Sequence, residues 1–137
     1  MKCYAVIDTN VLVSAMLRWN SVPGCVLEHA FVGDIIPLLN DDILKEYVEV
    51  LSRPKFHFDK EKIDIVIEDL IKRGIFVDAE KMGMELPDPK DVVFYEIVME
   101  KRKTEEAFLV TGNIKHFPIE SYIVTPREML TIIEMIE

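Results

Sequence analysis

The chain has 137 residues, of which 50% are hydrophobic and 30% are charged, and it contains 5 glycines and 7 prolines. This length suits one domain that buries its own core, and the composition excludes a disordered or collagen-like chain. The 25 acidic side chains outnumber the 16 basic ones, which gives a net charge of −9. This charge excludes a broad positive face for nucleic acid, so any nucleic-acid partner must be held locally.

The amino terminus and the cysteines point to a cytoplasmic protein without a membrane segment. Asp8 and Asn10 interrupt the first apolar stretch, so we expect no signal peptide and a mature protein that begins at Met1. No apolar run approaches the ~20 residues of a membrane helix. Cys3 and Cys25 lack the spacing of a zinc or disulfide motif, and we interpret both as small buried hydrophobes.

The order of the predicted elements is typical of βαβ units that form a parallel sheet. A fully apolar run at residues 4–7 predicts a central strand. The next predicted elements are a short helix at 10–17, a helix that Pro23 opens and Gly33 ends, a strand at 35–39 in which Pro37 suits an end or edge, and a helix that Asn40 caps and that ends before Arg53.

The second half of the chain continues this alternation of helices and strands. The predicted elements are a helix at 59–73 with Ile71 on its inner side, a brief strand at 76–77, a helix that opens at 88–91 and runs to about 102, strands at 107–111 and 122–124, and a closing helix that begins at Thr125 and Pro126. We find no repeat, low-complexity tract or linker, and therefore expect a single domain over residues 1–137.

Two acidic side chains occupy positions where a carboxylate needs an explanation. Asp8 follows the first strand, at the edge where open parallel sheets bind ligands, and a helix cap is its alternative role. Glu46 lies between Ile43 and Val50 on the stripe that should face the core. A buried unpaired charge is costly, so Glu46 must have partners, and a structural ion pair with Arg53 is the alternative.

A further acidic pair opens the helix that follows residue 88. Asp88 fits the N-cap, whereas Asp91 begins the apolar stripe that continues at Phe94. Together with Asp8 and Glu46, these acids come from three separate segments. Oxygen ligands of this kind suit Mg²⁺ or Mn²⁺, and such sites hydrolyse phosphodiesters by activating a water and stabilising the leaving oxygen.

Four segments taken together resemble the PIN domain family and, within it, the toxin–antitoxin ribonucleases. They are 8–14 (Asp-Thr-Asn-Val-Leu-Val-Ser), 43–47 with 51–56, 88–91 (Asp-Pro-Lys-Asp), and 109–113 with 116–117. The resemblance implies an α/β fold, a three-layer α/β/α sandwich with a central, mainly parallel sheet. It also implies a Mg²⁺- or Mn²⁺-dependent endoribonuclease that acts on single-stranded or structured RNA, forms a homodimer and is the toxin partner of an antitoxin.

The resemblance assigns the catalytic residues by position. It makes Asp8 and Asp91 metal ligands, Glu46 a ligand or an orienter of metal-bound water, and Asn10 a polar support for the site. Asp88 is a candidate for an additional acid. Asn113 stands where many family members have a fourth acid, and its amide can still hold a metal-bound water. Because that negative charge is missing, we expect one metal site and leave the second open.

The expected substrate contacts are polar and basic groups near the same end of the sheet. They are Asn10, Arg18, Arg53, Lys55, Lys115 and His116. His116 is either an ordinary loop histidine or a contact to a metal or a scissile phosphate. Trp19 stacks on an unpaired base or serves as a contact to a partner protein. We interpret His29 and His57 as structural.

Two other functions stay open at this point. A phosphatase of the haloacid-dehalogenase type also begins with a strand followed by an Asp, here Asp8, and has a later strand that ends in Thr. Against it, Asn10 replaces a second acid, and Asp88 and Asp91 precede the Thr strand rather than follow it. The other alternative is a PIN-like binding module whose catalysis is weakened by Asn113.

Overall fold

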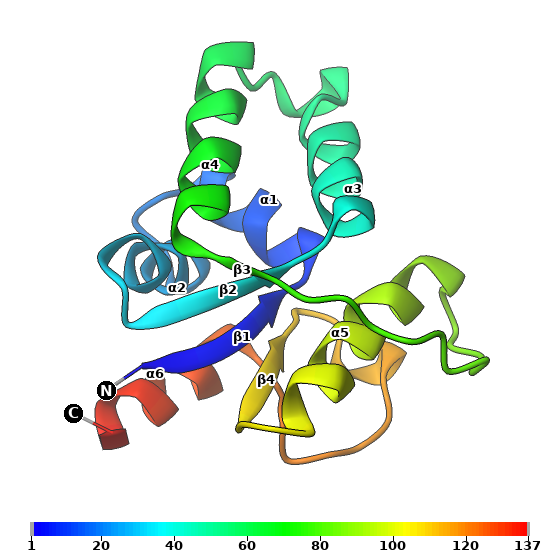
Figure 1. Cartoon of the computed structure of the whole chain (residues 1–137). Coiled ribbons are helices and arrows are strands. Elements are labelled where there is room, and N and C mark those ends of the chain that lie inside the picture. Colours follow the sequence, from blue (N-terminus) through cyan, green and yellow to red (C-terminus); the bar gives the residue numbers. More distant parts are fainter. Residues whose placement is uncertain (1, 137) are drawn as a thin grey trace.

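A five-stranded parallel sheet forms the centre of the protein, whose computed structural model describes residues 2–136. The strands are β1 (Cys3–Ile7), β2 (Ile35–Leu39), β3 (Ile75–Phe76), β4 (Ala107–Val110) and β5 (Ile123–Val124). Their order across the sheet is β3-β2-β1-β4-β5 (Figure 1). β1 is therefore the central strand, as its uninterrupted apolar sequence predicts, and the carboxyl ends of all strands meet at one edge.

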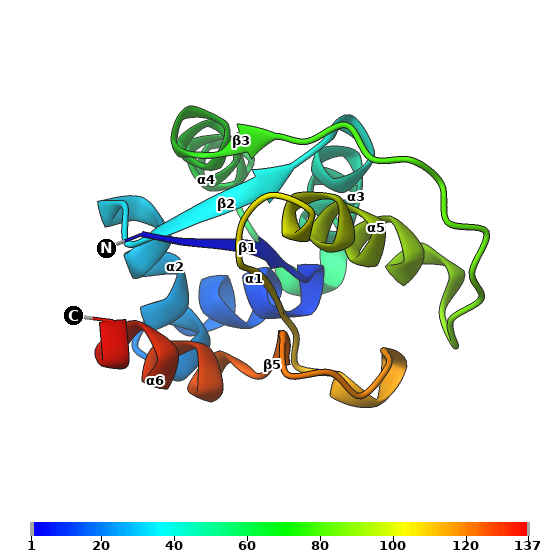
Figure 2. The same cartoon turned by 60° about the horizontal axis from the view of Figure 1, so that its bottom comes forward.

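Six helices cover this sheet and complete the layers. They are α1 (Thr9–Leu17), α2 (Val22–Val32), α3 (Asp41–Leu51), α4 (Lys60–Arg73), α5 (Val92–Arg102) and α6 (Pro126–Ile136). α1, α2 and α6 lie on one side of the sheet and α5 on the other (Figure 2). α3 and α4 pack against each other and rise above the sheet in Figure 1. The expected α/β/α sandwich is confirmed, and no helix within residues 2–136 has the length and apolar character to cross a membrane.

Several helix boundaries are set by the capping residues that the sequence predicts. The side chain of Asn40 accepts a hydrogen bond from the N–H of Ile43 at 2.8 Å, at the start of α3. Gly33 ends α2 with a φ of 95°, a left-handed conformation that glycine adopts without strain. At the start of α6, Thr125 and Glu128 exchange hydrogen bonds of 2.9 and 3.1 Å, which form a capping box.

Two segments differ from their predicted form. Pro89–Asp91 is a separate 3₁₀ turn ahead of α5, closed by the N–H of Asp91, which donates to the carbonyl of Asp88 at 3.0 Å. The carboxylate of Asp88 also accepts the N–H of Lys90 at 3.0 Å. β3 begins one residue earlier than predicted and pairs with β2 only at Leu38 and Leu39. The edge of β2 that faces β3 is therefore unpaired at Pro37. This explains how a proline is accommodated in the middle of this strand.

Two side chains that the sequence predicts to be buried are exposed. Cys25 lies on the outward side of α2, because it stands three residues before the exposed Glu28 and so shares its helix face. Ile71 is 42% exposed, since Ile67 and Leu70 already form the inner side of α4 at that point. Our interpretation of Cys25 as a buried hydrophobe was wrong, whereas Cys3 is buried as predicted.

Candidate active site

Asp8 directly follows β1 and is held at the carboxyl edge of the sheet. It is 4% exposed, and its Oδ2 accepts hydrogen bonds from Thr111 Oγ1 at 2.7 Å and from Asn10 Nδ2 at 3.0 Å. Its backbone N–H donates to the carbonyl of Val110 at 2.9 Å, so β1 and β4 stay paired up to the acid. The side chain makes no capping hydrogen bond to α1, so the capping alternative does not account for this carboxylate.

The loop after β4 completes the support of Asp8. Thr111 is fully buried, and its Oγ1 accepts the N–H of Asn113 at 2.9 Å while it donates to Asp8. The N–H of Gly112 donates to Asn10 Oδ1 at 3.0 Å, and a Cβ on Gly112 would lie 3.2 Å from that oxygen. Side chains therefore connect the two loops that follow β1 and β4.

Glu46 reaches the same edge of the sheet from α3. Its carboxylate accepts a hydrogen bond from Thr9 Oγ1. The adjacent Tyr47 is buried, and its hydroxyl donates to the backbone carbonyl of Ile7. Within residues 2–136, Glu46 forms no ion pair with Arg53, so the structural pair that the sequence left open is not present.

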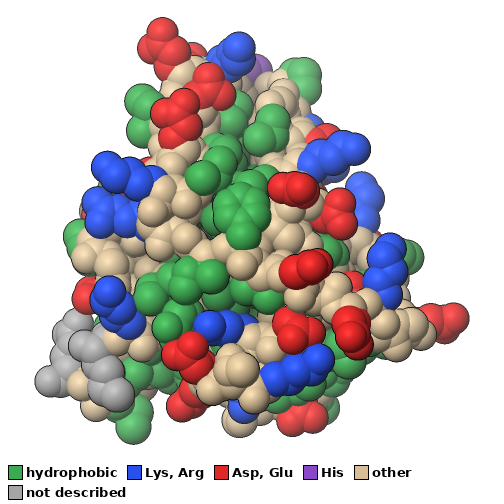
Figure 3. All heavy atoms as spheres, in the orientation of Figure 1, with side chains coloured by type: hydrophobic (Ala, Val, Ile, Leu, Met, Phe, Trp, Pro, Cys, Tyr) green, Lys and Arg blue, Asp and Glu red, His purple; other side chains and the backbone are tan. Residues whose placement is uncertain are grey.

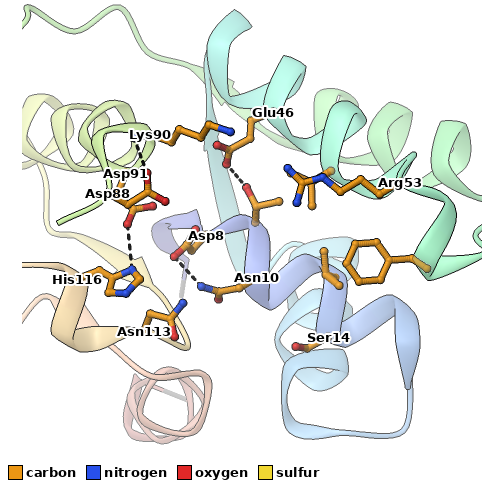
Figure 4. Close-up of a pocket in the computed structure, with 14 residues that line it drawn as sticks. Asp8, Asn10, Ser14, Glu46, Arg53, Asp88, Lys90, Asp91, Asn113 and His116 are labelled. Carbon is orange, nitrogen blue, oxygen red and sulfur yellow. Dashed lines mark hydrogen bonds and ion pairs between the residues drawn. The ribbon is translucent and has the colours of Figure 1, made fainter. Parts of the chain in front are cut away.

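Asp91 ends the 3₁₀ turn and is 8% exposed. Its Oδ2 is buried and has no hydrogen-bond partner. The Nδ1 atom of His116 lies 3.3 Å from this oxygen, which makes an ion pair when the imidazole is protonated but not a well-formed hydrogen bond (Figure 4). A buried carboxylate oxygen without a donor is unfavourable, and it is available to a cation.

Burial, together with neighbouring carboxylates for Glu46 and Asp91, disfavours ionisation of the acids at this edge. Burial raises the pKa of Asp8, and the hydrogen bonds that its carboxylate accepts only partly offset this. Burial and the charge of Asp8 raise the pKa of Glu46. Burial, followed by the charges of Asp8 and Asp88, raises the pKa of Asp91 to about 6. Such mutual repulsion between carboxylates is relieved when a cation lies among them.

One pocket of about 510 Å³ brings these acids together (Figure 4). Its volume is in the range of ligand sites, roughly 300–1,000 Å³. The sequence-predicted residues that line it are Asp8, Asn10, Glu46, Arg53, Asp88, Asp91, Asn113 and His116. The other three predicted substrate contacts are not in its lining. Arg18 follows α1, Lys55 has its Nζ 5.1 Å from the ring centre of Phe56, and Lys115 lines a neighbouring hollow.

Three residues that line this pocket or support its acids, Thr9, Lys90 and Thr111, have no role predicted from the sequence. Thr9 and Thr111 donate hydrogen bonds to the carboxylates of Glu46 and Asp8. Lys90 lines the pocket, and its charge partly offsets the rise in the pKa of Glu46. All three lie inside the motifs that carry the family resemblance. Their place in these motifs is the sequence signal from which a role could have been predicted. The remaining lining residues are Val13, Ser14, Val50 and Phe56.

Trp19 and His29 are held by contacts within the chain. The ring of Trp19 stacks on Phe31 with the ring centres 5.7 Å apart, and its Nε1 donates to Glu28 at 2.8 Å. His29 Nδ1 lies 2.7 Å from a carboxylate oxygen of Asp34, in agreement with a structural role. Neither side chain lines the pocket that contains the acids.

The donor set of the pocket fits a hard divalent cation. The candidate metal-ligand atoms are carboxylate oxygens. One of them, Asp91 Oδ2, is buried without a hydrogen-bond partner. Among residues 2–136, no three His, Cys, Asp or Glu side chains are grouped closely enough to form a complete ligand set by themselves. Mg²⁺ does not require such a set, because it commonly binds one or two carboxylates and retains several waters.

Comparison with known proteins agrees with this geometry. A family model described as the PIN domain matches residues 4–115, which include most of β1, all of β2 to β4 and the residues Asp8, Glu46 and Asp91. No curated protein matched the chain. PIN domains are usually metal-dependent nucleases, so the match favours the nuclease hypothesis over the haloacid-dehalogenase one. The chain belongs to the PIN domain family.

Proposed function

We propose that the protein is a Mg²⁺- or Mn²⁺-dependent endoribonuclease that hydrolyses phosphodiester bonds at the pocket around Asp8, Glu46 and Asp91. The observation that carries this proposal is the buried Asp91 Oδ2, which lacks a hydrogen-bond partner and lines one pocket with the two other acids. A buried carboxylate in this state is unfavourable, and a bound divalent cation would be a stronger partner than the His116 imidazole, whose Nδ1 lies 3.3 Å away. RNA is the substrate class that the family resemblance implies.

Asp8 and Asp91 would hold the ion, with Glu46 as a further ligand or as the acceptor that orients the attacking water. When bound, the ion neutralises phosphate charge and promotes ionisation of that water. Thr111 fixes the orientation of Asp8, and Thr9 fixes that of Glu46. Because both carboxylates are already oriented, little reorganisation is needed when substrate binds.

Local cations and polar groups around the pocket are the candidates for substrate contact. Lys90 and Arg53 line the pocket on either side of Glu46 and can neutralise phosphate charge (Figure 4). Asn113 and His116 lie on the opposite side of the pocket from Glu46. Acidic and basic side chains are interspersed on the face seen in Figure 3, and we assign the phosphate contacts of the substrate to these local groups.

Two partners follow from the resemblance to toxin–antitoxin ribonucleases, namely an antitoxin protein and a second copy of this chain. We expect the product of a neighbouring open reading frame to co-purify with the protein and to suppress its RNA cleavage. Light scattering of the purified protein measures the dimer, and a monomer at every concentration would contradict it.

Cleavage of single-stranded RNA by purified protein tests the nuclease proposal. We expect Mn²⁺-dependent cleavage by the wild type and a loss of at least about 100-fold in Asp8→Asn and Asp91→Asn, because even outer partners of metal ligands cost 10–100-fold. Asp64→Asn, an exposed position on α4, is the matched control and should retain the wild-type rate. Equal cleavage by all four proteins would indicate a contaminant and contradict the proposal.

Direct Mn²⁺ binding, followed by electron paramagnetic resonance, gives a readout that does not depend on cleavage. The wild type and Asp64→Asn should bind the ion, and Asp91→Asn should bind it at least about 10-fold more weakly. Binding of RNA and Mn²⁺ without cleavage would instead support the weakened binding module that Asn113 suggests.

A further inference from the structure

A hollow beside the catalytic pocket is lined without any acidic side chain. This hollow, called here the Lys115 hollow, has a volume of about 330 Å³ and is formed by residues 112–116 and Thr125. Asn113 and His116 line both the hollow and the pocket, so the two adjoin. Lys115 is the one lysine or arginine in this lining.

A second hollow adjoins the pocket on the side of α3 and is rich in acids. This hollow, called here the Lys45 hollow, has a volume of about 260 Å³ and shares Glu46, Val50 and Lys90 with the pocket. Its lining holds the carboxylates of Asp42, Glu46 and Glu49 against the ammonium groups of Lys45 and Lys90. Carboxylates therefore outnumber cations here, whereas the Lys115 hollow has a cation and no carboxylate.

The 3₁₀ turn Ile114–His116 holds Lys115 at the rim of its hollow. The turn is closed by the N–H of His116, which donates to the carbonyl of Asn113 at 2.9 Å. Lys115 is exposed, and within residues 2–136 it forms no ion pair, so its ammonium can bind a phosphate. The carboxylate of Glu128, on the neighbouring α6, caps that helix at Thr125 and is not in the lining of the hollow.

The two hollows offer different electrostatic routes for a strand that extends beyond the catalytic pocket. Each nucleotide adds a phosphate charge, and the protein has a net charge of −9, so the route with fewer carboxylates is favoured. We propose that the RNA strand leaves the pocket on one side, through the Lys115 hollow and with Lys115 on its backbone, and not along α3. This inference rests on the proposed nuclease function and adds the path of its substrate.

The salt dependence of RNA binding by two lysine variants tests this path. Lys115→Gln and Lys45→Gln each remove one exposed ammonium from a hollow next to the pocket and change the net charge equally, so a general charge effect is the same in both. Fluorescence anisotropy of a labelled single-stranded RNA gives the affinity at several salt concentrations. Ca²⁺ replaces Mn²⁺, because it also takes carboxylate ligands, and a denaturing gel checks that the RNA is intact.

We expect the log–log salt slope of Lys115→Gln to be shallower than that of the wild type by about 0.7, which is the contribution of one phosphate contact on a single strand. Lys45→Gln should keep the wild-type slope. Three results would overturn the one-sided path. They are a shallower salt slope for Lys45→Gln alone, equally shallower slopes for both variants, and unchanged slopes for both variants. If the wild type neither binds nor cleaves RNA, the nuclease proposal itself fails, which the cleavage assay detects separately.

Discussion

Thr111 and Asp8 stand 103 positions apart in the sequence, and a hydrogen bond of 2.7 Å joins their buried side chains. The hydroxyl of Thr111 also accepts the N–H of Asn113 at 2.9 Å. One side chain thus fixes the orientation of the Asp8 carboxylate and the start of the loop that carries Asn113. The hydroxyl therefore links the carboxyl ends of β1 and β4, which the backbone hydrogen bond from Asp8 to Val110 also joins.

Thr111→Val should therefore impair both stability and RNA cleavage. Valine keeps the shape of threonine but leaves the Asp8 carboxylate and the Asn113 N–H without this partner, which should reduce the free energy of unfolding by about 1–3 kcal/mol. Thr111→Ser keeps the hydroxyl and should retain most of the cleavage rate. Urea denaturation and cleavage assays measure the two effects, and equal cleavage by Val and Ser variants would exclude a functional role for the hydrogen bond.

Asp91→Asn should stabilise the metal-free protein above about pH 6 but not below about pH 4. Burial and the charges of Asp8 and Asp88 raise the pKa of Asp91 from 3.8 to about 6 in the folded protein. A carboxyl group with a raised folded pKa contributes stability below its unfolded pKa, and this contribution is lost as the pH rises through the folded pKa. The wild type should lose on the order of 3 kcal/mol over this interval, and the variant should lack that loss.

Unfolding temperatures in EDTA across this pH range measure the effect, with Asp64→Asn as the control. Addition of Mn²⁺ should reverse the order at neutral pH, because an ion at 100 times its Kd stabilises the folded state by about 2.7 kcal/mol. An unfolding temperature of the wild type that does not respond to Mn²⁺ would argue against a cation among these acids.

Gly24→Ala should destabilise the protein by at least about 2 kcal/mol, the scale of overpacking in a close contact. A Cβ at this position would lie 1.8 Å from the backbone oxygen of Trp19, because the loop before α2 packs directly on the helix. Gly83→Ala is the comparison, since nothing lies within 4 Å of its Cβ and only its φ of 65° adds a cost of roughly 1–2 kcal/mol. Thermal unfolding measures both, and a smaller loss for Gly24→Ala would contradict the contact.

Most helices and strands could be predicted because their signals are local in the sequence. Caps at Asn40, Gly33 and Thr125 mark helix ends through contacts that span only a few residues. The 3₁₀ turn at 89–91 could not be separated from a first turn of α5, because a capping Asp followed by proline is compatible with both. The exposure of Cys25 depends on which side of α2 faces its neighbours, and apolarity alone does not specify that.

The acids of the candidate site could be found because strand ends and inner helix positions are visible as patterns. Their partners could not, since the contact between Asp8 and Thr111 exists only after β1 and β4 pair. The basic residues illustrate the same limit, because Arg53 lines the pocket whereas Arg18 does not. The direction of Lys90 depends on the 3₁₀ turn that carries it.

The hydroxyl of Tyr47, which donates to the carbonyl of Ile7, joins the residues that adjoin Glu46 and Asp8. The separation of these two acids is thus set in the interior of the protein and not by the surface loops. Substitutions confined to the loops around the pocket should therefore leave the spacing of the two carboxylates unchanged.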